Sequence, residues 1–419
     1  MKLLEELHHP EKYFKILVKW GALGMLMGLL GGWLGAAFHH TLHFVTHLRA
    51  ENTWFIFLLP VGGLLTVGLY HWLFQGRNRG TNEIIDAVLN GQPVNPLIAP
   101  AIFTATGITH LFGGSAGREG AALQIGGSVA SLLGRLLKLK DNERTVLVMS
   151  GLSAVFAGLF GTPLTATLFT MEFASVGTIF SPALLPCYLA AFSASQVSAA
   201  LGVHAETAVL HTVLDITATN GLKLAGLAVA VGIMGVVMCY TFHKAEHFAK
   251  DKIPKPWLRI TLGGAVILLL TLFAGDHRYN GAGMDMALQA VEGHADWYDF
   301  AMKLIFTAVT LAAGYKGGEI VPTFCIGATF GCLVGGFLGL DPGVSAALGL
   351  VGLFCCATNS PITSIILSIE MFGGSNLYAF TLVCVVAYVV SGNWGLYSSQ
   401  IIRFSKARLI RKPSGEQKH

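Results

Sequence analysis

Charge is scarce in this chain of 419 residues, since only 12% of them are Asp, Glu, Lys or Arg. That fraction is about half of the 25% usual in soluble globular domains. None of the 7 cysteines has CxxC spacing, and the N-terminal stretch lacks a small-residue cleavage pattern, so we expect packing thiols and no signal peptide. The scarcity of charge excludes nucleic-acid binders, disordered regulators and ordinary cytosolic enzymes. Hydrophobic residues make up 53% of the chain and glycine occurs 51 times, which predicts an all-α polytopic membrane protein.

Basic residues flank the apolar region at both of its ends. Lys12, Lys15 and Lys19 flank the first apolar segment, and Arg403 and Lys406 follow the last one. Basic residues beside membrane segments favour the cytoplasmic side, so we expect a multi-pass protein of a bacterial inner membrane with both termini in the cytoplasm. The lipid bilayer is then a partner, and a net charge of only +4 gives no sign of nucleic-acid binding.

Several apolar segments are shorter than the roughly 20 residues that a spanning helix needs, and glycine pairs interrupt many of them. Gly113-Gly114 and Gly317-Gly318 are two such pairs. Broken helices are tolerated at membrane depth only where they are buried in protein or line a cavity. The pattern therefore predicts a transporter or channel with broken and re-entrant helices. The longest polar interval, residues 275–299, predicts a loop with short helices outside the membrane.

The chain contains an internal repeat. Residues 161–172 (GTPLTATLFTME) match residues 359–370 (NSPITSIILSIE), with proline, threonine and glutamate each recurring 198 positions later. Residues 117–127 resemble residues 318–328 at an offset of 201. Two ordered matches in nearly constant register predict two related halves.

Related halves in membrane proteins usually pack in inverted orientation about a pseudo-two-fold axis, with the ion site at their interface. We therefore predict a first transmembrane repeat over residues 1–205 and a second over 206–402. A short cytoplasmic tail, 403–419, follows.

Four glutamates lie inside the apolar segments, where a charge at the bilayer centre costs at least about 2.5–3.5 kcal/mol. Glu172 and Glu370 are repeat mates at helix ends, and we interpret them as polar anchors. Glu119 and Glu319 each stand at a glycine-rich break just before an apolar helix. A helix that begins inside the membrane presents unpaired N–H groups and a positive dipole end. Two such helix starts, one from each half, predict an anion-binding centre.

Two other patterns allow different functions. Gly113-Gly-Ser115-Ala-Gly117 fits the GxSxG pattern of a nucleophile, with His110 close in sequence, so an intramembrane serine hydrolase is a rival hypothesis. His39, His43 and His47 recur on one helical face and would suit a zinc site or a proton relay. An interfacial polar face explains these histidines more simply.

The two glycine breaks read GREG at residues 117–120 and GGEIVP at residues 317–322. With these sequences the chain resembles the CLC family of chloride channels and anion/proton antiporters. Residues 117–120 (GREG) resemble the family's GREGP motif, and residues 317–322 (GGEIVP) resemble its GGxFxP motif. The helices that start at Pro163 and Pro361 match too, as does Tyr397 in the sequence GLYSS. The resemblance implies a CLC-type fold of inverted-topology repeats.

The same resemblance implies a homodimer in which each subunit has its own anion pathway. It implies that Glu119 is the gating and proton-carrying glutamate and that Tyr397 donates its hydroxyl to the anion. No cofactor is implied. The further anion-binding residues that it implies in the two helix starts are Arg118, Gly120, Ile320 and Val321.

Three departures from the family pattern bear on selectivity. The family's GSGIP filter motif is missing from the equivalent stretch, residues 75–84. Phe173 stands where chloride/proton antiporters usually carry an inner proton-relay glutamate, and Glu319 replaces an apolar residue. These features resemble the fluoride-exporting branch, in which Glu319 would serve proton coupling or selectivity. The candidates for the lost filter serine are Gly80, Thr81 and Asn82.

We therefore predict a proton-coupled anion antiporter, not an enzyme, that exports fluoride in exchange for protons. A chloride/proton antiporter and a passive chloride channel of the same family are the alternatives, since the missing inner glutamate also permits a channel.

Overall fold

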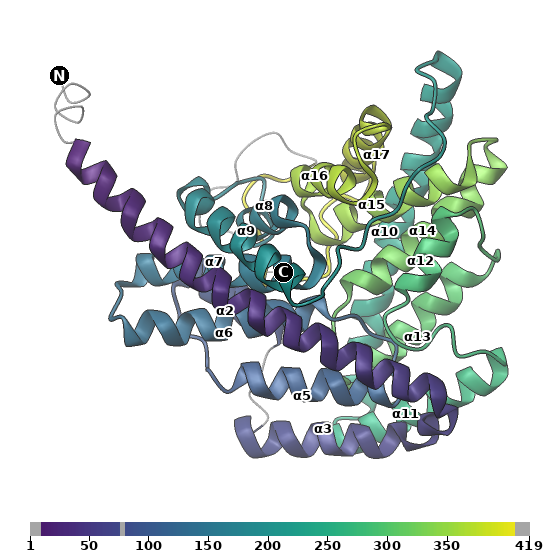
Figure 1. Cartoon of the computed structure of the whole chain (residues 1–419). Coiled ribbons are helices and arrows are strands. Elements are labelled where there is room, and N and C mark those ends of the chain that lie inside the picture. Colours follow the sequence, from purple (N-terminus) through teal and green to yellow (C-terminus); the bar gives the residue numbers. More distant parts are fainter. Residues whose placement is uncertain (1–9, 76–79, 407–419) are drawn as a thin grey trace.

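The computed structural model of the chain describes residues 10–75 and 80–406, and almost all of the regular structure is helical (Figure 1). Seven of the described helices are long and apolar enough to cross a membrane. The prediction of an all-α polytopic membrane protein is therefore confirmed. The segments 1–9, 76–79 and 407–419 lie outside the described residues, and with them Arg79 and most of the predicted tail.

The elements of the first half follow one another with short connections. They are α2 (Pro10–Glu51), η1 (Thr53–Leu58), α3 (Leu59–Phe74), α4 (Thr81–Asn90), α5 (Ile98–Leu111), α6 (Glu119–Leu136), α7 (Asp141–Phe160), α8 (Pro163–Glu172), β1 (Ser175–Val176), η2 (Ser181–Ala183) and α9 (Leu184–Ala200).

The second half repeats this alternation of long and short helices. Its elements are α10 (Ala218–Lys252), α11 (Pro256–Ala274), α12 (Met284–Val291), α13 (Asp299–Ala313), α14 (Ile320–Phe337), α15 (Pro342–Thr358), α16 (Pro361–Phe372), α17 (Leu377–Val390) and β2 (Ile401–Ile402). The polar interval predicted between α11 and α13 holds the short helix α12.

Two helix triplets with matching order carry the sequence repeat. In Figure 1, α6 and α7 lie on one side, α14 and α15 lie on the other, and α8 and α16 meet between them. Gly126 of α6 approaches α7 so closely that a Cβ on it would lie 2.2 Å from the carbonyl oxygen of Gly151. Gly327 of α14 stands in the same relation to Gly349 of α15, at 2.5 Å. Both pairs of helices therefore need glycine at their crossing point.

Glu172 and Glu370 join the triplets to each other. The carboxylate of Glu172, at the end of α8, accepts hydrogen bonds from the N–H groups of Ile362 (3.2 Å) and Thr363 (2.9 Å), at the start of α16. The carboxylate of Glu370, in α16, accepts from Leu164 (2.9 Å) and Thr165 (2.8 Å), at the start of α8. Each glutamate thus caps the other repeat's helix, because the first N–H groups of a helix have no partner within it. This mutual capping gives each of the two predicted polar anchors a definite partner, which is the start of the other repeat's helix.

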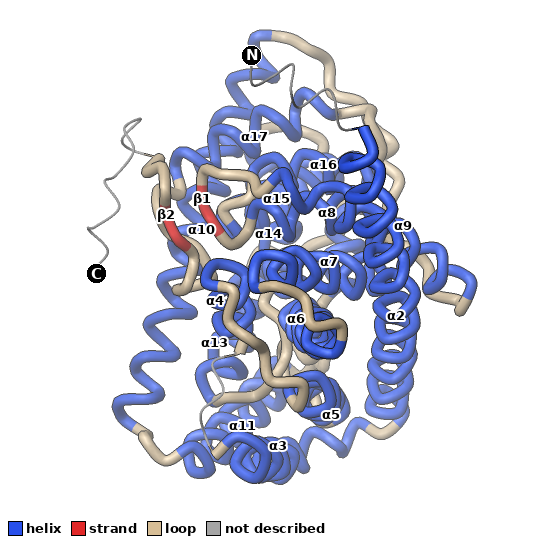
Figure 2. Tube along the Cα trace, turned by 90° about the vertical axis from the view of Figure 1, so that its left-hand side faces the viewer, coloured by secondary structure: helices blue, strands red, loops and turns tan. Residues whose placement is uncertain are grey.

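A C-terminal segment returns to the centre of the molecule after α17. Its strand β2 pairs in parallel with β1, with Ser175 opposite Ile401 (Figure 2). Further back along the segment, the N–H of Leu396 donates to the carbonyl of Ala357 at 2.8 Å. These contacts bring the next residue, Tyr397, to a buried position beside Phe173.

Candidate functional site

The two glycine breaks of the sequence meet in space. The N–H of Gly117 donates to the carbonyl of Gly318 at 2.7 Å, and the N–H of Gly318 donates to the carbonyl of Gly117 at 2.7 Å. The two residues form an isolated antiparallel bridge. Because α6 starts at Glu119 and α14 starts at Ile320, this bridge holds two helix N-termini from the two halves against each other.

Glu119 is fully buried at this meeting point. Its Oε2 atom accepts hydrogen bonds from the N–H of Arg118 at 3.1 Å and from the N–H of Val321 at 3.2 Å. Its Oε1 atom is buried and has no hydrogen-bond partner among the described residues. The carboxylate therefore bridges the two helix starts, in a place where backbone N–H groups and helix dipoles favour an anion.

The glycines of the two breaks leave room for this carboxylate. A Cβ on Gly117 would lie 2.4 Å from Oε2 of Glu119, and a Cβ on Gly318 would lie 2.6 Å from the same atom. Any larger residue at either position would displace the Glu119 side chain. The glycine-rich sequence is thus a requirement of the site as well as of the helix breaks.

The Tyr397 hydroxyl is a second buried polar group near the centre. It has no hydrogen-bond partner among the residues that the structure describes. Its ring stands edge-on to that of Phe173, with centroids 6.2 Å apart, and Phe173 in turn stacks on Phe169 at 4.9 Å. Phe173, the residue that the resemblance places at the inner proton-relay position, therefore belongs to a buried aromatic cluster.

The start of α4 approaches the start of α6. The hydroxyl of Thr81 accepts a hydrogen bond from the Gln124 side chain at 3.4 Å, and a Cβ on Gly120 would lie 3.1 Å from that hydroxyl. Asn82 points elsewhere, because its side-chain oxygen accepts from the N–H of Ser399 at 3.1 Å. Gly80 precedes them as the N-cap residue of α4, with φ of +64°. Of the two side chains predicted here, that of Thr81 lies beside α6.

The remaining predicted residues use their backbone or face other groups. The guanidinium of Arg118 forms an ion pair with Glu206, donates to His39 at 3.1 Å and lies over the ring of Phe160 at 5.3 Å. Only the backbone N–H of Arg118 therefore faces the Glu119 carboxylate. Glu319 is the N-cap residue of α14, and its side chain is partly buried.

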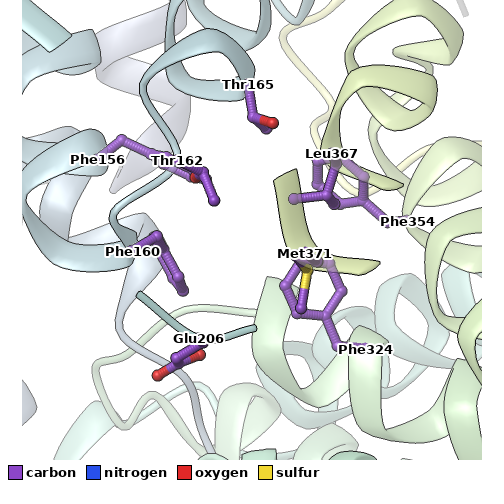
Figure 3. A pocket seen from close by; sticks show the side chains of 9 residues that line it. All are labelled: Phe156, Phe160, Thr162, Thr165, Glu206, Phe324, Phe354, Leu367 and Met371. Atoms are coloured by element: carbon purple, nitrogen blue, oxygen red, sulfur yellow. The ribbon is translucent and has the colours of Figure 1, made fainter. Parts of the chain in front are cut away.

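Glu206, the ion-pair partner of Arg118, also lines a pocket (Figure 3). Three of its polar atoms are buried and lack a partner among the described residues, namely Thr162 Oγ1, Thr165 Oγ1 and Glu206 Oε2. The rest of its wall is apolar, and its side chains come from α7, α14, α15 and α16. These apolar lining residues are Phe156, Phe160, Phe324, Phe354, Leu367 and Met371.

The rival patterns find no support in the geometry. Ser115 is fully buried, and its hydroxyl contacts Lys303 and Thr307 at 3.0 Å each, whereas Nδ1 of His110 faces the carbonyl of Thr106. The arrangement of a serine nucleophile with a histidine base is therefore not formed. Within the described ranges, no group of three or more His, Cys, Asp or Glu side chains could hold a metal ion.

Two residues near the site were missed by the sequence reasoning. Gln124 donates to the carbonyl of Gly120 at 3.1 Å as well as to Thr81. Lys303 is fully buried in α13. Both are polar residues in apolar segments. The signal that indicates them in the sequence is the same one that distinguishes the four intramembrane glutamates.

Comparison with known proteins shows to which family this chain is similar. The family described as voltage gated chloride channel matches residues 62–392. A chloride/fluoride channel protein of Pseudomonas syringae pv. tomato is 34% identical over 397 residues, covering 93% of this chain and 88% of the relative. An H(+)/Cl(-) exchange transporter of Vibrio campbellii is 25% identical, covering 93% of this chain and 90% of the relative.

The solved structures agree. The crystal structure of a CLC-type fluoride/proton antiporter superposes with a TM-score of 0.89 at 33% identity, covering 93% of this chain and 99% of that one. A slow cyanobacterial Cl-/H+ antiporter superposes at 0.76 with 20% identity, covering 89% and 94%, which shows a shared fold. The resemblance noted at the glycine breaks thus extends over nearly the whole chain. The protein belongs to the voltage-gated chloride channel (CLC) family of anion channels and antiporters.

Proposed function

We propose that the protein is a proton-coupled antiporter that exports fluoride in exchange for protons, with Glu119 as gate and proton carrier. The observation that carries the proposal is the position of the Glu119 carboxylate, which accepts from the N–H groups of Arg118 and Val321. A carboxylate in that place occupies a site suited to an anion.

Protonation gives the exchange its mechanism. When Glu119 takes up a proton, its carboxyl loses the charge that the two helix starts attract. A fluoride ion can then take its place, and the protonated side chain can carry its proton to the other side. Release of the proton restores the carboxylate, which displaces the anion again. One group thus serves both substrates, because the ionised carboxylate and fluoride compete for one set of N–H donors and protonation of the carboxylate releases those donors.

The other anion ligands come from three helix starts. Gly120 belongs to the start of α6, and the amides of Ile320 and Val321 belong to that of α14. The unpartnered hydroxyl of Tyr397 is a further donor. The start of α4 supplies Gly80, Thr81 and Asn82, of which Thr81 is our candidate for the lost filter serine because of its approach to Gly120. Arg118 contributes its backbone N–H.

Fluoride suits this set of donors because it is a smaller and more basic anion than chloride and a stronger hydrogen-bond acceptor. The relative from Pseudomonas syringae is named a chloride/fluoride channel protein, and the structure with a TM-score of 0.89 is a fluoride/proton antiporter. We assign proton coupling or selectivity to Glu319, which precedes the amide ligands on α14.

The assembly that we propose is a homodimer with one anion pathway in each subunit, in the inner membrane of a bacterium, with both termini in the cytoplasm. Each subunit consists of repeats 1–205 and 206–402 and the tail 403–419. The mutual capping of α8 and α16 by Glu172 and Glu370 supports this division, because it relates equivalent atoms of the two halves.

The experiment is an efflux assay on purified protein in proteoliposomes. Vesicles loaded with equal concentrations of fluoride and chloride are diluted into an anion of low permeability, and both efflux rates are followed with ion-selective electrodes. We expect fluoride to leave faster than chloride. Equal rates would favour the chloride/proton antiporter, or the passive channel if no proton moves.

A further inference from the structure

Lys303 is a buried cation that the exchange mechanism does not use. It lies in α13 and is fully buried. Its ammonium group donates to Ser115 Oγ at 3.0 Å, to the carbonyl of Tyr279 at 3.1 Å and to the carbonyl of Gly281 at 2.8 Å. An ammonium group has three protons, so each one has an acceptor. No described carboxylate forms an ion pair with it.

Its first partner lies in the break that precedes the gate. Ser115 stands between α5 and α6, two residues before Gly117 and four before Glu119. Besides the bond from Lys303, the Ser115 hydroxyl contacts Thr307 Oγ1 at 3.0 Å, and its N–H donates to Thr310 Oγ1 at 3.0 Å. The three residues of α13 are spaced i, i+4 and i+7 and therefore share one helical face. That face fixes the break against the second half.

The other two partners lie in the loop after α11. This loop also binds the break directly, since the N–H of Gly281 donates to the carbonyl of Gly114 at 3.0 Å and the Asn280 side chain donates to the carbonyl of Gly113 at 2.7 Å. Gly283 has φ of +91°, and a Cβ on it would lie 2.7 Å from Cε of Lys303. The loop therefore folds tightly over the lysine, and the ammonium group joins loop and break.

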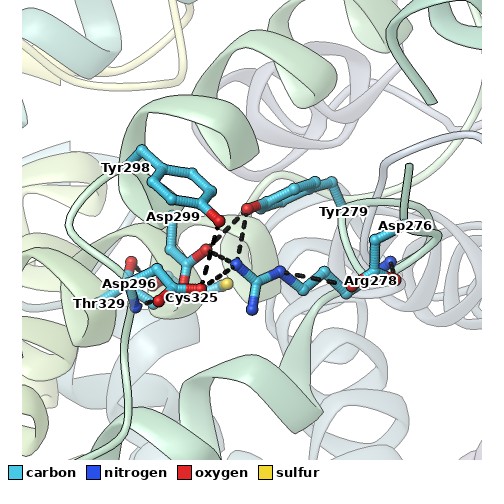
Figure 4. A network of polar contacts seen from close by, with 8 residues as sticks. All are labelled: Asp276, Arg278, Tyr279, Asp296, Tyr298, Asp299, Cys325 and Thr329. Atoms are coloured by element: carbon cyan, nitrogen blue, oxygen red, sulfur yellow. Dashed lines mark hydrogen bonds and ion pairs between the residues drawn. The ribbon is translucent and has the colours of Figure 1, made fainter. Parts of the chain in front are cut away.

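A polar network holds the loop in that place (Figure 4). Arg278 donates to Asp296 at 2.6 Å and to Asp299 at 2.5 Å, and the Tyr279 hydroxyl donates to Asp299 at 2.7 Å. Asp299 is the first residue of α13. Loop and helix are thus fixed to each other at the start of α13, one turn before Lys303 in the sequence.

We infer that Lys303 is a positioning residue for the Glu119 gate. The bridge between Gly117 and Gly318 and the contact of Glu119 with Val321 both require the break to be held in register with α14. Lys303 holds the break in this position from α13, the helix that directly precedes α14. A neutral side chain could tie loop and break at a lower desolvation cost, whereas an ammonium group satisfies three acceptors from two segments at once.

The inference rests on the proposed exchange function and is tested with the full chain in proteoliposomes. The test variants are Lys303→Met, which removes the cation but keeps the length, and Ser115→Ala, which removes one acceptor and keeps the cation. Ile305→Ala, on the same helix but with a side chain 44% exposed, is the matched control. Proton uptake driven by a fluoride gradient and fluoride efflux are measured for each, and gel filtration identifies folded protein.

In both test variants we expect proton uptake per fluoride to fall about tenfold, because a displaced Glu119 loses proton transfer while fluoride still passes. A misplacement of about 1 Å at reacting groups can cost as much as about 100-fold in rate, so a tenfold fall corresponds to a smaller displacement. Ile305→Ala should keep the wild-type ratio. Folded Lys303→Met and Ser115→Ala with the wild-type ratio and efflux rate would overturn the inference. If Lys303→Met does not fold, Ser115→Ala alone decides. If the wild type moves fluoride without protons, the proposed exchange fails, and the variants are then judged on the fluoride efflux rate.

Discussion

Gly117 and Gly318, which are 201 positions apart and repeat mates, hold each other by two backbone hydrogen bonds of 2.7 Å. This bridge brings together two helix starts that the sequence places in different halves. The Glu119 carboxylate then accepts from both starts, through Arg118 and Val321. The site is therefore a product of the repeat, since neither half alone supplies both donors.

Gly318→Ala should disable transport. The new Cβ would lie 2.6 Å from Oε2 of Glu119 and 2.7 Å from its backbone nitrogen, so the Glu119 side chain has to move. We expect fluoride efflux to fall about tenfold or more, in line with the effect of misplaced reacting groups. Gly336→Ala in α14, the helix that follows Gly318, is the control, because no atom outside that helix's own backbone lies within 4 Å of its Cβ position. Normal efflux in Gly318→Ala would show that the gate is not confined there.

Glu172→Gln should lower stability and leave coupling unchanged. The Glu172 carboxylate accepts three hydrogen bonds, from the N–H of Ile362 and from the N–H and hydroxyl of Thr363. Weakening such a charged helix cap costs about 1–2 kcal/mol, which a thermal melt in detergent measures. Glu292→Gln, at an exposed position, should melt like the wild type. A variant at Glu172 with an unchanged melting temperature but lost proton coupling would make this residue a proton relay instead of a cap.

Phe173→Leu should keep proton coupling, whereas Phe173→Glu should not improve it. The Phe173 ring is fully buried between Phe169 and Tyr397. A carboxylate there would lie among aromatic rings, and an unpaired buried charge is costly. We expect Phe173→Glu to melt at a lower temperature and Phe173→Leu to exchange normally. Loss of proton uptake in Phe173→Leu would mean that protons pass through this aromatic cluster.

The loop that holds Lys303 should loosen at alkaline pH. Burial raises the pKa of the Tyr279 hydroxyl, and its hydrogen bond to Asp299 raises that pKa further. A raised pKa in the folded state gives stability that is complete below the unfolded pKa of about 10 and is lost as the pH rises through the folded value. Melting temperatures of the wild type should therefore fall faster above about pH 10 than those of Tyr279→Phe. Parallel curves would contradict this assignment.

The repeat and the glycine breaks could be predicted from the sequence because they are local patterns. The motif around Glu119 lies on one short segment, and its copy around Glu319 follows at a fixed offset. A low charge content also makes each intramembrane glutamate conspicuous. These signals were enough for the fold class and for the family.

Side-chain partners could not be predicted in the same way. Arg118 directly precedes Glu119 in sequence, yet its guanidinium pairs with Glu206, which lies 88 positions away. Lys303 reaches Ser115 across 188 positions. The choice between Thr81 and Asn82 likewise depends on how α4 lies against α6. Such contacts depend on how helices from distant parts of the chain pack. The periodicity of residues within one segment does not predict that packing.

In the mechanism that we propose, Glu119 couples the anion to the proton at one site. Its most direct test is proton movement into proteoliposomes under an outward fluoride gradient, with no pH gradient at the start. We predict that the wild type takes up protons against the gradient that develops, and that Glu119→Gln takes up none. Fluoride efflux without proton uptake in the wild type, or undiminished uptake in Glu119→Gln, would contradict the account.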